Sequence, residues 1–169
     1  MIKQTLAAVA IATLAFAPHE LPELKLGDKA PALDVKMKDV SGKEIDLRTA
    51  AGKNGLLVVF SCNTCPFVVG KDESKGWEGR YPAVAGLADK NGVGFALVNS
   101  NTLMREKGDG MADMQQRYKD KKFKGLYLLD DNNRVADAFG ARTTPHVYLF
   151  DKDMKLVYKG AIDDNVADP

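Results

Sequence analysis

The sequence predicts an α/β domain in which helices flank a central sheet. Residues 56–60 and 93–98 are short, mostly apolar runs, as in strands that are buried on both faces of a sheet. Segments with apolar residues at helical spacing alternate with these runs. The order of elements along the chain is βαβαββα, which is typical of a sheet covered by helices.

Length and composition fit one domain with its own core. The chain has 169 residues, of which 45% are apolar and 28% charged. The formal net charge is +1, so charge gives no reason to expect a nucleic-acid partner or an anionic membrane surface. Residues 119–124 are locally basic, but Asp120 lies among them, and we interpret them as a solvated surface.

Residues 1–17 are expected to be a secretory signal peptide. Lys3 gives a short positive start, residues 6–17 are almost entirely apolar, and Ala15-Phe16-Ala17 has the small-x-small form of a cleavage site. The apolar run is too short to span a bilayer. We therefore expect a periplasmic or secreted protein without stable membrane association after cleavage. The alternative is a short buried helix.

A Pro- and charge-rich lead-in segment, residues 18–30, precedes the folded domain, which we place at residues 31–169. Residues 32–37 alternate apolar and polar side chains and are predicted to form a half-buried strand. Residues 39–43 have turn chemistry, and residues 44–47 are predicted to return as the second strand of a hairpin.

The chain is organised around residues 55–67, which hold its two cysteines. The predicted strand at residues 56–60 is followed by a turn at Ser61, and Cys62 and Cys65 then stand at the expected start of a helix. Residues at i and i+3 lie close enough on a helix face to form a disulfide. The orphan N–H groups and the positive dipole end of a helix stabilise a thiolate at Cys62. This arrangement fits a reversible dithiol.

A C-x-x-C motif has two other uses. A zinc site needs four ligands, and besides the cysteines the chain offers only His19 and His146. We therefore expect no metal site. A purely structural disulfide that closes so short a loop stabilises a fold little, because the entropic effect grows with loop length. The motif favours redox chemistry.

The segment after the cysteines begins with Pro66, which is tolerated in the first turn of a helix. Residues 67–69 are expected to complete a turn or two. Residues 70–79 are polar and contain three glycines, and we interpret them as an excursion that Trp77 anchors.

The remaining elements follow in a regular order. Helices are predicted at residues 81–90, 111–121 and 134–139, and strands at residues 93–98, 126–129, 146–150 and 155–159. In the first of these helices Val84, Leu87 and Ala88 have the spacing of a buried face. Asn99-Ser100-Asn101 follows a buried strand, at an edge where functional loops tend to lie. The alternative for these residues is simple satisfaction of loop backbone groups.

Thr144-Pro145 opens the predicted strand at residues 146–150. The residue before a proline is biased toward extended backbone, and a proline in this position is a candidate for a cis peptide bond. With the C-x-x-C motif, it forms a second feature that favours a redox site.

On these features the chain resembles the thioredoxin-fold superfamily, and within it the redoxin branch, which is grouped with alkyl hydroperoxide reductase and thiol-specific antioxidant and is peroxiredoxin-like. The match to members with a C-N-x-C-P site runs through Phe60-Ser61-Cys62-Asn63-Thr64-Cys65-Pro66-Phe67-Val68, Gly76-Trp77-Glu78-Gly79-Arg80-Tyr81, Val98-Asn99-Ser100-Asn101, Thr144-Pro145, Leu156-Val157-Tyr158-Lys159-Gly160 and Asp163-Asp164. The resemblance covers residues 25–165. It implies a thioredoxin-like fold, with a central mixed β-sheet flanked by helices and an N-terminal β-hairpin extension.

The resemblance also implies roles for the site residues. Cys62 is expected to be the nucleophile, with a lowered thiol pKa, and Cys65 the resolving cysteine. No cofactor besides their redox-active disulfide is expected. The expected substrate-binding residues are Asn63, Thr64, Pro66, Thr144 and Pro145. His146 is expected to lie beside the sulfurs as a donor to a thiolate, or else to be an ordinary strand residue.

Within that set, the cis-proline loop implies that Pro145 shapes the substrate groove and that the Thr144 backbone pairs with an incoming strand. Asn63 and Thr64 are expected to tune the stability of the thiolate, and hence the redox direction. The alternative for these two residues is an ordinary helix start.

The sequence departs from two patterns of the superfamily. Counted back from Cys62, the P-x-x-x-T/S-x-x-C motif of peroxiredoxins falls on Val59 at the hydroxyl position and on Gly55 at the proline position. The buried acid that thioredoxins carry six residues before the first cysteine falls on Leu56. A peroxide pocket of the usual kind is therefore missing, and proton transfer must come from elsewhere in the protein or from water.

The sequence thus predicts an exported enzyme, a thiol–disulfide oxidoreductase that exchanges disulfides with protein substrates. A thiol peroxidase with an antioxidant role is one alternative, and a non-catalytic copper-binding or interaction module is another. The expected partners are protein thiols or disulfides and an upstream redox partner, with no nucleic acid, and the protein is expected to be a monomer.

Overall fold

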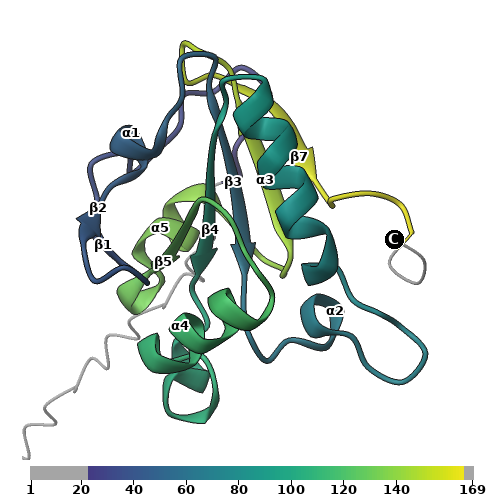
Figure 1. Cartoon of the computed structure of the whole chain (residues 1–169). Helices are drawn as coiled ribbons and strands as arrows, with labels where there is room; N and C mark the ends of the chain where they lie inside the picture. The colour runs from purple at the N-terminus through teal and green to yellow at the C-terminus, as the bar shows by residue number, and fades with distance from the viewer. Residues whose placement is uncertain (1–22, 166–169) are drawn as a thin grey trace, which may run out of the picture.

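The computed structural model describes residues 23–165, so the predicted signal peptide and the start of the lead-in segment lie outside the described residues. Figure 1 shows the arrangement of the elements. In chain order they are β1 Met37–Asp39, β2 Glu44–Ile45, α1 Leu47–Ala50, β3 Leu56–Ser61, α2 Pro66–Val69, the 3-10 turn η1 Glu78–Arg80, α3 Tyr81–Lys90, β4 Gly94–Asn99, η2 Thr102–Lys107, α4 Met111–Asp120, β5 Leu126–Leu129, η3 Asp131–Asn133, α5 Arg134–Phe139, β6 His146–Phe150 and β7 Leu156–Gly160.

The strands form one mixed sheet in the order β2-β1-β5-β4-β3-β6-β7. Strands β3, β4 and β5 run parallel to one another, whereas β6 is antiparallel to β3, β7 to β6 and β1 to β5. The expected mixed sheet with helices around it is confirmed. Because Ser61 is paired with Asn99 at the ends of β3 and β4, the chain leaves both strands at the same edge of the sheet.

Two hydrophobic clusters cover the two faces of the sheet. Side chains alternate along β3, so Val58 and Phe60 belong to the cluster that contains α5, and Val59 belongs to the cluster that contains α3 and α4. Figure 1 shows α3 in front of the sheet and α5 behind it. The central strand is thereby buried on both faces, as the apolar run predicts.

The N-terminal hairpin is present but shorter than predicted. The strand expected at residues 32–37 is wrong in its bounds, because Ala32 has a positive φ of 52° and β1 begins only at Met37. The return strand expected at residues 44–47 ends at Ile45. The reason is Asp46, whose side chain accepts a hydrogen bond from the Thr49 N–H at 2.7 Å and so starts α1.

Apart from α1, which was not predicted, and α2, which starts later than predicted, the other predicted helices and strands lie within a residue or so of their predicted bounds, and α3 has the predicted bounds. Its buried face differs, however. Leu87 is 63% exposed, and the buried residues are Tyr81, Ala85 and Ala88. The Tyr81 hydroxyl shares a buried hydrogen bond of 2.8 Å with Ser61 Oγ at the end of β3, and this contact fixes the rotation of the helix.

The described part of the lead-in segment runs beside β7. Gly27 N–H donates to the Leu156 carbonyl at 2.8 Å, and Leu156 N–H donates to the Asp28 carbonyl at 2.8 Å. Within residues 23–165, no helix has the length and apolar character that a membrane crossing requires.

Candidate active site

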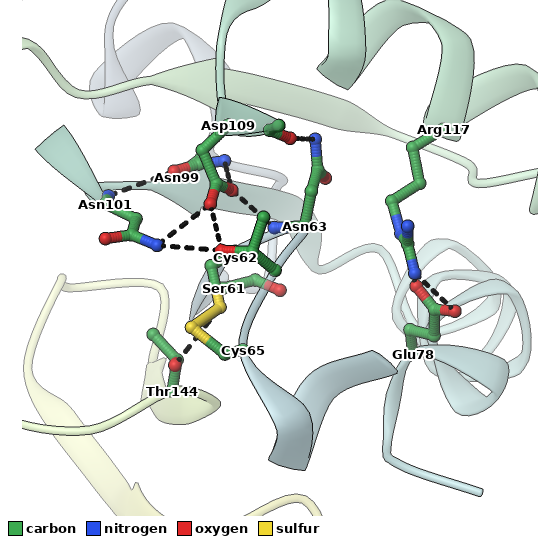
Figure 2. The surroundings of a disulfide bond; sticks show 12 residues. Ser61, Cys62, Asn63, Cys65, Glu78, Asn99, Asn101, Asp109, Arg117 and Thr144 are labelled. Carbon is green, nitrogen blue, oxygen red and sulfur yellow. Dashed lines mark hydrogen bonds and ion pairs between the residues drawn. A yellow bond between two sulfur atoms is a disulfide. The ribbon is translucent and has the colours of Figure 1, made fainter. Parts of the chain in front are cut away.

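The two cysteines form a disulfide in the loop between β3 and α2. The Cys62 and Cys65 Cα atoms are 5.8 Å apart, within the usual range for a bridge. Figure 2 shows the disulfide at the end of the strand, with Thr144 on one side and polar side chains from β4 and its following loop on the other.

The helix begins later than the sequence analysis placed it. Cys65 is the N-cap residue of α2, and Pro66 is its first helical residue. The expectation that Cys62 stands at the helix N-terminus is therefore wrong, because Asn63 and Thr64 form a bend between strand and helix. Proline is favoured at the first helical position, since it lacks an N–H that would be unpaired there. Cys65 is the cysteine beside the helix start.

The two sulfurs differ in exposure. Cys62 is 1% exposed and belongs to the hydrophobic cluster on the α3 face. Cys65 is only partly buried, and it lines a cavity of about 230 Å³ together with Asn101, Arg142 and Thr144. In the disulfide form, Cys65 is therefore the cysteine that a molecule in this cavity meets.

The cis-proline loop contacts the disulfide from the other side. The peptide bond between Thr144 and Pro145 is cis, as the sequence predicts. The Thr144 hydroxyl lies 3.3 Å from Cys62 Sγ. Thr144 therefore contacts Cys62 through its side chain, a contact that the sequence did not predict. The role predicted for Thr144 was backbone pairing with a substrate strand.

His146 finds a partner other than a cysteine. Its Nδ1 lies 3.2 Å from the Tyr148 hydroxyl, and its ring lines a different cavity of about 150 Å³ that neither cysteine lines. Burial and then the nearby Lys159 charge lower the pKa of His146. This geometry therefore favours the alternative interpretation, in which His146 is an ordinary residue of the strand.

Asn63 and Thr64 contact a buried carboxylate that the sequence analysis missed. Asp109 is fully buried, and it accepts a hydrogen bond from the Asn63 N–H and another from Thr64 Oγ1 at 2.6 Å. Asn99 and Asn101 donate to the same carboxylate through their side-chain amides, at 2.7 and 2.8 Å. Figure 2 shows Asp109 pointing toward Asn101 and the cysteine loop. The Asn99-Ser100-Asn101 motif therefore belongs to the site.

The loop before α4 lies close against the segment between the cysteines. Gly108 has a φ of 116°, and a Cβ built on it would come within 2.9 Å of the Thr64 side chain. The Gly108 carbonyl accepts a hydrogen bond from Asn63 Nδ2 at 2.9 Å. Glycine before Asp109 is the one sequence signal that marks this close approach.

Arg105 ties the ends of the parallel strands together. Its guanidinium donates to the backbone carbonyls of Asn99, Asp109 and Asp130 and to Asn99 Oδ1, at 2.8–3.0 Å. Its Nε is buried without a partner among the described residues. Burial lowers the pKa of Arg105, and the negative charge of Asp109 opposes that shift. Arg105 was not among the site residues predicted from the sequence.

Within residues 23–165, no three potential metal-ligating side chains come together. The fold and the Cys62–Cys65 disulfide together define a class: a thioredoxin-like protein with a C-x-x-C disulfide at the end of its central strand. The Redoxin family model matches residues 25–168, and the chain belongs to this family, which makes it an oxidoreductase. Among curated proteins, none matches the chain.

Solved structures include close matches of the fold. An uncharacterized conserved protein from Geobacillus kaustophilus is 29% identical with a TM-score of 0.75, over 89% of this chain and 75% of that protein. A hypothetical protein from Sinorhizobium meliloti is 28% identical with a TM-score of 0.74, over 85% and 74%. The thioredoxin domain of a thiol-disulfide oxidoreductase from Bacteroides vulgatus is 21% identical, with a TM-score of 0.63 over 86% and 94%, and is similar in fold.

Proposed function

We propose that the protein is an exported thiol–disulfide oxidoreductase whose Cys62–Cys65 couple exchanges disulfides with protein substrates. The observation that carries the proposal is the disulfide at the end of β3, with Cys65 lining a cavity and Thr144 in contact with Cys62. Export is supported by the apolar N-terminal run of the sequence, and sequencing the N-terminus of the mature protein from a cell fraction tests it.

The exchange needs no reactant besides thiols and disulfides. A cysteine thiolate attacks one sulfur of a substrate disulfide, forms a mixed disulfide and releases the other substrate sulfur as a thiolate that takes a proton. The second cysteine, as a thiolate, attacks the mixed disulfide, which releases the substrate dithiol and leaves the Cys62–Cys65 disulfide. An upstream partner resets the couple by the same steps in reverse.

The sequence assigns the first attack to Cys62 and the resolving step to Cys65. The Thr144 backbone and Pro145 would position the substrate strand, and exposed Pro66 would border it next to Cys65. Asn63 is 5% exposed, which supports an action through the loop rather than direct contact with a substrate.

Two single-cysteine variants test the function and the order of attack. Reduced C65S and C62S are incubated with a disulfide-bonded peptide, and mixed disulfides are located by mass spectrometry. Trapping on Cys62 in C65S is the expected result. Trapping only on Cys65 in C62S would reverse the two roles. The greater exposure of Cys65 in the disulfide form is the observation that would agree with that result. If neither variant forms an adduct and the wild type shows no reversible dithiol couple, the function is refuted.

The thiol peroxidase alternative has weaker support. Val59, at the position of the peroxiredoxin hydroxyl, is 1% exposed and packs in the core, and a valine donates no hydrogen bond to a peroxide. Catalytic consumption of hydrogen peroxide by the reduced protein would favour the peroxidase, and stoichiometric retention of copper would favour the binding module.

A further inference from the structure

A buried negative charge lies against the two residues that separate the cysteines. The Asp109 Oδ1 accepts from Asn63 N–H and the Asn99 side chain, and its Oδ2 accepts from Thr64 Oγ1 and the Asn101 side chain. All four donors are neutral groups. Two of the four belong to the segment between Cys62 and Cys65.

Among residues 23–165, no cation is paired with this carboxylate. Arg105 is the charged neighbour, and its Nη1 donates to the Asp109 backbone carbonyl at 3.0 Å and to Asn99 Oδ1 at 2.8 Å. In the part of the chain that the structure describes, no ion pair reaches the Asp109 side chain. Because water does not reach a fully buried group, its charge acts on its surroundings with little screening.

We propose that Asp109 is a positioning residue that holds the Asn63–Thr64 segment and biases the Cys62–Cys65 couple toward the disulfide. This inference rests on the proposed function, since it concerns the same couple. The disulfide is uncharged, whereas the reduced form carries a thiolate at a pH above its thiol pKa, and a nearby carboxylate disfavours that thiolate. The hydrogen bonds to the segment also keep the cysteines at bridging separation. Both effects stabilise the oxidised form.

The variant D109N removes the charge and leaves a network that is able to rearrange. An amide oxygen still accepts from Asn63 N–H and Asn99. On the other side, the new amide donates to Thr64 Oγ1, because a hydroxyl also accepts, and Asn101 turns its own amide oxygen toward it. The change in redox behaviour therefore reports mainly the loss of the charge.

The test is the equilibrium of the full chain with glutathione. One protein disulfide and two glutathione thiols give one protein dithiol and one glutathione disulfide, and acid trapping measures the ratio. At a pH above the thiol pKa of both proteins, D109N is expected to shift this equilibrium about tenfold toward the dithiol, which is about 30 mV for a two-electron couple. The thiol pKa, read from the pH dependence of iodoacetamide alkylation, is expected to fall by about one unit.

A matched control and a second measurement make the outcomes distinct. D113N removes an exposed carboxylate four residues away and is expected to keep the wild-type equilibrium and thiol pKa. A folded D109N that behaves like D113N overturns the inference. If D109N does not fold, the wild type decides: its thiol pKa is expected above the ordinary cysteine value of about 8.5, and a value at or below it overturns the inference. Absence of any couple in the wild type is a failure of the proposed function instead.

Discussion

Arg105 is the residue whose replacement gives the sharpest test of the hydrogen bonding at the strand ends. We consider R105K, which keeps the positive charge and removes the planar fork. The guanidinium serves four acceptors through two nitrogens: Nη1 bonds Asn99 Oδ1 and the Asp109 carbonyl, and Nη2 bonds the Asn99 and Asp130 carbonyls. A lysine presents all its donors from a single nitrogen.

The expected loss follows from the acceptors that a lysine leaves without a partner. If the single nitrogen keeps two of the four acceptors, two remain unpaired, at about 1–3 kcal/mol each when buried. The acceptors belong to Asn99, Asp109 and Asp130, which are at most 1% exposed, so even the lower end of that range lowers the free energy of unfolding by about 2 kcal/mol. That is about a thirtyfold change in the unfolding equilibrium, and a decrease in Tm of about 4–8 °C.

Urea denaturation of R105K beside R48K measures this loss. The guanidinium of Arg48 donates to a carboxylate, that of Asp34, and both side chains are mostly exposed, at 62% and 76%. R48K is therefore expected to change the free energy of unfolding by less than about 0.5 kcal/mol. If R105K and R48K unfold at the same urea concentration with equal slopes, the four hydrogen bonds of Arg105 do not contribute the stability assigned to them.

Two further predictions concern the core and pH. F139A is expected to lower the free energy of unfolding by about 3–5 kcal/mol, because the fully buried Phe139 ring packs edge-on against three aromatic rings. Urea denaturation measures this loss, and F67A, at a ring that is 66% exposed, is the control. Equal losses in the two variants would contradict the role of the aromatic cluster. Burial, and after it Lys159, lowers the pKa of His146 in the folded state, so protonation opposes folding. The stability that neutral His146 contributes is complete above its ordinary pKa of about 6.5 and is lost as the pH falls through the folded value. The wild type should therefore lose more stability than H146Q between about pH 7 and pH 5, and parallel urea midpoints would refute this.

The sheet and its main helices were predictable because local signals agree with the fold. The apolar run at residues 56–60 is a strand buried on both faces, and α5 ends where Gly140 adopts a left-handed φ of 66°. The alternation of apolar and polar side chains at residues 32–37 led to a wrong prediction, because it reflects which side chains are buried and not whether the backbone forms a strand. Leu33 and Val35 pack against the core from a loop, and a loop that lies on a core alternates as a strand does.

The start of α2 could also have been predicted from the sequence. Pro66 is a signal for the first helical position, which makes Cys65 the N-cap. Asp109 and Arg105 were harder to find, since the contacts that bring them to the site join distant parts of the chain: 46 positions from Asn63 to Asp109 and 25 from Arg105 to Asp130. The parallel order of the strands sets this pairing, and Gly108 is the one sequence signal beside it.

The late start of α2 changes which groups control the couple. A helix of four residues has a small dipole, and it begins beside Cys65, so it gives Cys62 little of the stabilisation that the sequence analysis assigned to it. The buried carboxylate of Asp109 is then a charge held against the loop between the cysteines, while Arg142 lines the same cavity as Cys65. Asn63 and Thr64 act as its donors, which explains why polar residues stand between these cysteines. With a pair that lacked the threonine hydroxyl, Oδ2 would keep only Asn101 as a donor. Of that pair, only the Asn63 side chain would then hold the loop to the sheet edge, since it donates to the Gly108 carbonyl and accepts from the Tyr127 hydroxyl.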